Sequence, residues 1–240
     1  MTQSRAAAIS PNRTRVQQIA IAVLALSIAA FTGAASASSI NLTYQDSGLF
    51  GASDLQQTVK ITTSGPGYDG NVKAGMFHMK SDDALGNFLA FCVDLTQYIG
   101  SPMTAEYNSN LFTGTTYDNL SRLFSSVLGG SSLAEVIDTS LEAAALQVAI
   151  WEVMLDSGGA YDLNSGAFKM GSNVAVKTQA QSYLTNLWTG KVGDYKLTFL
   201  ESAQNQDLVT VTPVPLPAGG VLIGTGLIAL FAAGRRRKAA

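Results

Sequence analysis

Apolar and polar residues alternate along several short segments of the chain, which is the pattern of β-strands with one buried face. The predicted strands cover residues 40–46, 57–64, 72–81, 88–99, 194–202 and 207–213. Polar DDALGN joins the third strand to the fourth, as expected for two strands that pair side by side. The first four strands therefore precede, and the last two follow, a region with a different pattern.

In that region apolar residues recur with the 3.6-residue period of helices. The predicted helices cover residues 117–129, 140–156 and 173–188. The second has the clearest ends: Ser140 can cap it, Glu142 lies in its first turn, and Gly158 and Gly159 follow it. Strands, then helices, then strands predict an α+β fold, with a mainly antiparallel sheet and about three packed helices.

The N-terminus has the order of a secretory signal peptide, which signal peptidase removes. Arg5, Arg13 and Arg15 make it basic, an apolar run covers residues 19–35, and small residues at 35 and 37 form a cleavage site. We therefore predict a signal peptide over residues 1–37. The alternative is an uncleaved anchor, which fits the short run and the cleavage site less well.

The C-terminus predicts a membrane helix. Residues 218–234 carry no charge, and their 17 positions approach the lower limit for spanning a bilayer. The basic residues that follow at once are Arg235, Arg236, Arg237 and Lys238. Because Lys and Arg favour the cytoplasmic side, residues 235–240 should stay inside and the body of the protein outside.

A proline motif precedes this helix. It consists of Val214, Pro215, Leu216, Pro217 and Ala218. Motif, apolar helix and arginine cluster together resemble the PEP-CTERM sorting signal of Gram-negative bacteria, in its VPLPA variant, over residues 213–240. The resemblance implies a precursor anchored in the inner membrane, processing by an exosortase, and a mature form at the cell surface or outside the cell. It also implies a link to biofilm and exopolysaccharide. A permanent anchor is the alternative.

The remaining residues, 38–212, are long enough for one domain with a core. This region holds 8 basic and 17 acidic residues, a net charge of −9. Such a surface repels phosphate backbones, so we expect no nucleic-acid partner. We also expect no cofactor, and an enzyme is the weakest hypothesis because no convincing base accompanies a nucleophile.

Cys92 is the single cysteine of a chain predicted to be exported. It lies in a strongly apolar segment, where a buried thiol is a poor partner for a disulfide between chains. In helix 140–156, Gln147 shares a face with Ala143, Ile150 and Trp151, so its amide needs buried hydrogen-bond partners. A buried cysteine and a buried glutamine are what an internal thioester requires; an unreacted cysteine beside a satisfied glutamine is the alternative.

Two motifs carry a second resemblance, to the Cys-Gln thioester domains of bacterial surface proteins. They are Phe91-Cys92-Val93-Asp94 and, after it, Gln147, Ala149, Ile150 and Trp151. The resemblance implies that the Cys92 sulfur accepts the acyl group of Gln147, with Asp94 and Trp151 as supports. It implies an adhesin that acylates an amine or hydroxyl on a surface. The other hypothesis is a non-covalent envelope or matrix protein.

Two further candidates are weaker. His78 is the only histidine, and it lies in a strand pattern, so we expect a solvent-face or core histidine rather than a catalytic one. Asp156, Asp162 and Asn164 lie in a glycine-rich loop but lack the spacing of a calcium loop, so we expect a turn and no metal.

Overall fold

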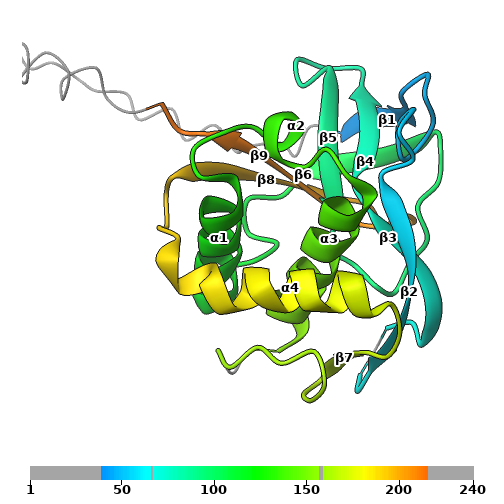
Figure 1. Ribbon diagram of the computed structural model, residues 1–240. Helices are drawn as coiled ribbons and strands as arrows, with labels where there is room; N and C mark the ends of the chain where they lie inside the picture. Colours follow the sequence, from blue (N-terminus) through cyan, green and yellow to red (C-terminus); the bar gives the residue numbers. More distant parts are fainter. Residues whose placement is uncertain (1–38, 66, 157–158, 216–240) are drawn as a thin grey trace, which may run out of the picture. The chain divides into compact units, whose positions relative to one another are not determined.

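Six antiparallel strands close into a barrel in the computed structural model, which describes residues 39–65, 67–156 and 159–215 (Figure 1). Around the barrel the strands are β1 (Ser39–Tyr44), β4 (Phe77–Ser81), β5 (Asn87–Cys92), β9 (Leu208–Pro213), β8 (Tyr195–Glu201) and β6 (Met103–Tyr107). The barrel closes where β6 pairs with β1, with Ile40 opposite Ala105. Closure leaves β9 paired on both edges, with β5 and with β8.

A second sheet of three strands has β2 (Gln56–Thr63) at its centre, between β3 (Gly70–Gly75) and β7 (Phe168–Met170). The alternation in the sequence of β2 matches its burial. Val59 and Ile61 are fully buried, and their neighbours Thr58 and Lys60 are exposed. The sheet therefore has one face on the core and one face in solvent.

The helices are α1 (Gly114–Leu128), the one-turn α2 (Leu133–Val136), α3 (Ser140–Leu155) and α4 (Val174–Asn186), which runs into a 3₁₀ turn at Leu187–Thr189. Thr139, not Ser140, caps α3. Its hydroxyl accepts a hydrogen bond from the Glu142 amide at 3.2 Å, and the Glu142 carboxylate accepts one from the Thr139 amide at 3.1 Å. This capping box satisfies amides that the first helical turn leaves free.

Helix α3 is the centre of the fold. It contacts β2, β3 and β7, and also α1 and α4 (Figure 1). Every residue from 143 to 153 is buried, so the helix is enclosed on all sides rather than amphipathic. Its only polar residues in that stretch are Gln147 and Glu152, whose side chains must find partners inside the protein.

The predicted α+β fold with antiparallel strands and three longer helices is confirmed. Two predicted strands are shorter than expected. The segment 72–81 is divided at Met76, where the chain passes from β3 in one sheet to β4 in the other. The segment 88–99 stops being a strand after Cys92, because the Asp94 carboxylate accepts a hydrogen bond from the Thr96 amide and turns the chain.

The predicted signal peptide (1–37) and membrane helix (218–234) lie outside the described residues. The same holds for Leu216, Pro217 and Ala218 of the sorting motif and for the basic tail. Val214 and Pro215 are described and follow β9 directly; the Val214 amide donates to the Asp194 carbonyl at 2.8 Å. Among the helices within 39–215 that the structure describes, none has the length and apolar composition to cross a membrane.

Candidate functional site

Cys92 lies at the end of β5, where the barrel loses a strand partner. On one side, β9 continues the ladder, and the Val93 amide donates to the Asp207 carbonyl at 2.8 Å. On the other side, β4 begins at Phe77, which is opposite Ala90. The main chain of Cys92 therefore extends past the start of β4, with its buried amide and carbonyl facing α3.

Gln147 supplies the missing partner from α3. The Cys92 amide donates to the Gln147 side-chain oxygen Oε1 at 2.9 Å, and the Gln147 nitrogen Nε2 donates to the Cys92 carbonyl at 2.9 Å. The carboxamide thus reproduces the two hydrogen bonds of an antiparallel strand pair. Cys92 is 0 % and Gln147 1 % exposed, so no water competes for these groups. We call this arrangement the Cys92–Gln147 pair.

The sulfur of Cys92 lies against the main chain of Asp94. The thiol donates to the Asp94 carbonyl at 2.6 Å, and the Asp94 amide donates to the sulfur at 3.3 Å. Burial raises the pKa of the Cys92 thiol to about 12, which outweighs the opposite effect of the Asp94 amide. The thiol is therefore protonated at neutral pH.

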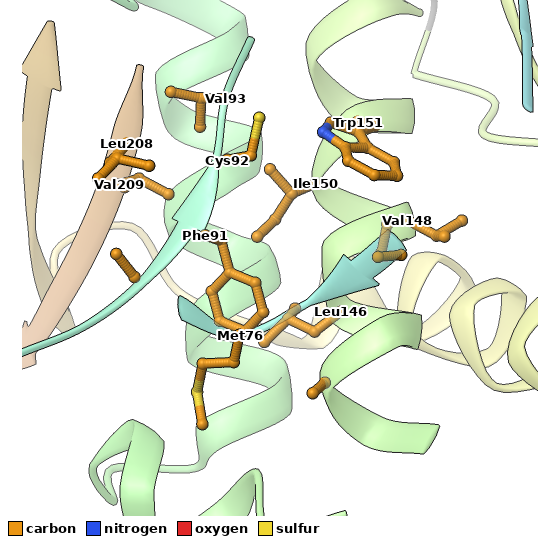
Figure 2. Close-up of a cluster of buried hydrophobic side chains, with 14 of the residues drawn as sticks. Met76, Phe91, Cys92, Val93, Leu146, Val148, Ile150, Trp151, Leu208 and Val209 are labelled. Atoms are coloured by element: carbon orange, nitrogen blue, oxygen red, sulfur yellow. The ribbon is translucent and has the colours of Figure 1, made fainter. Parts of the chain in front are cut away.

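The two predicted supports lie beside this thiol. The indole ring of Trp151 faces Cys92 from α3 (Figure 2), and its N–H lowers the pKa of the thiol against the effect of burial. Apart from this interaction with the sulfur, the buried nitrogen has no hydrogen-bond partner within the described part of the chain. The Asp94 carboxylate accepts a hydrogen bond from the Thr96 amide through Oδ1 at 2.6 Å. The other carboxylate oxygen of Asp94, Oδ2, is buried and also has no described partner.

A cavity of about 380 Å³ reaches this site from the surface. Cys92 and Trp151 line its inner end, and Tyr68 and Tyr98, which are 37 % and 78 % exposed, line its outer part. We call it the Cys92 cavity. It gives a small molecule a route to Cys92, whereas Gln147 is buried and is not among the lining residues.

The remaining candidates do not line the Cys92 cavity, and the His78 Nε2 atom has no hydrogen-bond partner among the described residues. His78 lies on β4 with its ring against Gly51, and burial lowers its pKa; it is not among the residues of the Cys92 cavity. Asp156 accepts the amides of Ala167 and Phe168 at the start of β7. Asp162 forms a turn with Asn164.

No group of three or more His, Cys, Asp or Glu side chains in the described ranges is arranged to hold a metal ion.

Sequence reasoning brought out Cys92, Gln147, Asp94 and Trp151, and the structure places all four together. It did not find the Cys92 cavity. The outer aromatic residues of the cavity come from the loop before β3 and the loop after β5, and no motif connects them. Their meeting follows only from how the two sheets are placed.

Comparison with known proteins gives little. No family model matches the chain, and no curated protein matches it. One similar solved structure is the N-terminal domain of the Streptococcus pyogenes pilus tip adhesin Cpa, at 16 % identity and a TM-score of 0.37, covering 57 % of this chain and 84 % of that one. At this level of similarity, neither the fold nor the function of that domain is transferred to this chain.

Proposed function

We propose that this chain is an exported cell-surface protein in which Cys92 and Gln147 form an internal thioester used for covalent attachment. The observation that carries the proposal is the Cys92–Gln147 pair. A buried carboxamide is held against the main chain of the one cysteine by two hydrogen bonds of 2.9 Å. Such positioning is the main requirement for a reaction between two side chains of modest reactivity.

The bond-forming step needs no cofactor. The Cys92 sulfur adds to the Gln147 carbonyl carbon, the carbon–nitrogen bond breaks, and the thiol proton leaves with the amide nitrogen as ammonia. The Cys92 amide already donates to Oε1, so it would stabilise the negative charge that develops on that oxygen. The Asp94 amide and the Trp151 indole N–H favour the thiolate against the opposing effect of burial.

Attachment reverses the roles. A nucleophile enters the Cys92 cavity and adds to the same carbon, the carbon–sulfur bond breaks, and the proton of the nucleophile passes to the sulfur. The product joins Gln147 to the acceptor and frees the Cys92 thiol. Burial of both Cys92 and Gln147 limits the access of bulk water to the thioester.

The cellular part of the proposal rests on the sequence. The signal peptide, the VPLPA motif and the basic tail support export, sorting by an exosortase and a place at the surface of a Gram-negative cell. The last strand of the barrel, β9, ends at Pro213, and the motif begins with the next residue, Val214. Processing there would therefore leave the barrel intact.

A second candidate is a non-covalent envelope or matrix protein with an unreacted Cys92. It is favoured by the same two hydrogen bonds, because they satisfy the Gln147 amide and the Cys92 main chain without any covalent bond. In that case Gln147 serves only as the last rung of the β5 ladder.

The intact mass of the purified protein separates the two. A thioester lowers the mass by about 17 Da through loss of ammonia, and methylamine then adds at Gln147. Cys92→Ala and Gln147→Ala variants are the controls and should show the full calculated mass. If the unchanged protein also has its full mass, and its cysteine is alkylated by iodoacetamide once unfolded, the covalent function is wrong.

A further inference from the structure

The lining of the Cys92 cavity indicates what kind of acceptor can reach the pair. Its lining is largely apolar and includes Leu49, Val72 and Leu95 together with Phe50 and Phe77. Its volume of about 380 Å³ lies in the range of pockets that enclose small organic ligands. The question is which chemical class its polar and aromatic groups recognise.

Charge argues against an amine. Lys73 is the single charged residue of the lining, and no Asp or Glu is among the described residues there. A protonated amine would enter beside this ammonium group, while the Asp94 carboxylate, which acts on the thiol, is not part of the lining. The Lys73 nitrogen also lies 5.9 Å from the centre of the Phe50 ring, so it already occupies the aromatic face that could attract a cation.

The neutral groups of the lining favour a different ligand. The rings of Tyr68 and Tyr98 meet edge to face with centroids 6.4 Å apart, and both are open to solvent. Asn71, Gln97 and Gln206 add side-chain amides, which both donate and accept hydrogen bonds. Aromatic faces pack against the C–H faces of sugar rings, and neutral amides match hydroxyl groups, which likewise donate and accept.

We propose that the Cys92 cavity binds a neutral saccharide and presents one of its hydroxyl groups to the thioester. This inference rests on the proposed function for its covalent step, although the binding step does not need the thioester. The hydroxyl oxygen adds to the Gln147 carbonyl carbon, the carbon–sulfur bond breaks, and the hydroxyl proton passes to the Cys92 sulfur. The product is an ester between Gln147 and the saccharide, with no change of oxidation state.

The covalent test measures the intact mass of the full chain after incubation with cellotetraose, with maltotetraose, or with 1,4-diaminobutane at equal concentration. We expect an adduct of one tetrasaccharide mass on the thioester form, and slower reaction of the diamine. Tyr98→Ala should slow the saccharide adduct by roughly three- to tenfold through loss of the stacking face. Trp188→Ala removes an exposed aromatic residue that does not line the cavity, so it should leave the rate unchanged.

The binding test uses Cys92→Ala, which cannot form a thioester, and follows the same tetrasaccharides by saturation-transfer NMR. The inference is supported if the saccharide gives saturation-transfer signals with Cys92→Ala and these signals are weaker with the double variant that also carries Tyr98→Ala. Saccharide binding by Cys92→Ala, together with a full calculated mass for the unchanged protein, would refute the thioester and leave the ligand class standing. The inference would be overturned if the diamine formed an adduct while no saccharide formed an adduct or bound. It would also be overturned if no variant bound a saccharide. In both cases the loss of about 17 Da decides separately whether the thioester forms.

Discussion

Replacing Gln147 with leucine should destabilise the fold strongly, because the carboxamide is the partner of two buried main-chain groups. The change keeps the side chain of similar size but removes both the acceptor for the Cys92 amide and the donor to the Cys92 carbonyl. Each buried group left without a partner costs about 1–3 kcal/mol. Leaving both main-chain groups without partners should therefore cost about 2–6 kcal/mol, a large part of the roughly 5–15 kcal/mol by which a domain is stable.

The assay is urea unfolding, followed by circular dichroism. Both the reference and the Gln147→Leu protein should carry Cys92→Ala, so that a covalent link in the reference does not enter the comparison. The main-chain groups of residue 92 remain in that background. A loss of less than about 0.5 kcal/mol, the range of ordinary surface substitutions, would show that Gln147 does not hold the end of β5.

A Gln147→Glu change in the same background provides a matched control with a pH signature. One carboxyl oxygen can still accept from the Cys92 amide, but the other must be protonated to donate to the Cys92 carbonyl. The folded protein therefore holds this proton more tightly than the unfolded chain, and the pKa of Glu in place of Gln147 is raised on folding. Stability should be near that of the reference below about pH 4 and should fall as the pH rises above the unfolded pKa.

Two further predictions concern α3. Burial, and then the nearby Asp156 carboxylate, raise the pKa of Glu152 to about 8, so its contribution to stability is present below the unfolded pKa of about 4.5 and is lost as the pH rises through 8. Glu152→Gln should flatten that dependence between pH 5 and 9 in urea unfolding, and an unchanged slope would contradict the assignment. Thr139→Ala should cost about 1 kcal/mol by removing the cap on the Glu142 amide, measured as a lower Tm; a Tm equal to that of the unchanged protein would show that the capping box is dispensable.

The sequence was sufficient for elements whose residues alternate cleanly. Strands β1, β2, β8 and β9 were predicted to within two residues. In β1 and β2 the buried positions recur at every second residue, whereas Leu208 to Val211 of β9 are all buried. The break at Met76 was missed because apolar residues occupy positions 74–77 without interruption, so the pattern could not show the chain changing sheets. The three residues of β7 are too few for a period to be visible, and in β6 the alternation extends only from Met103 to Glu106.

For the site, the helical period of the sequence predicted that Gln147 is buried in α3, and Cys92 was a candidate because it is the single cysteine. The contact between them depends on β4 ending its pairing at Phe77, which is a property of the whole barrel. The helix was expected to have an apolar face, whereas all its central residues are buried, because the three-stranded sheet, the end of β5 and two helices surround it. Packing of this kind depends on segments far apart in the chain and leaves no local signal.

The closed barrel determines how this protein would carry mechanical load. A force between an acceptor on Gln147 and the segment that follows Pro213 enters the fold through β9, which ends at that proline. β9 is bonded to β5 at Phe91 and Cys92, and to β8 from Leu200 to Tyr195. Leu208 and Val209 are held on both edges, so this part of the strand cannot peel away like the outer strand of an open sheet, whereas Thr210 to Pro213 pair with β8 alone. The pull is instead resisted in shear by two ladders, one of which ends beside the attachment point itself.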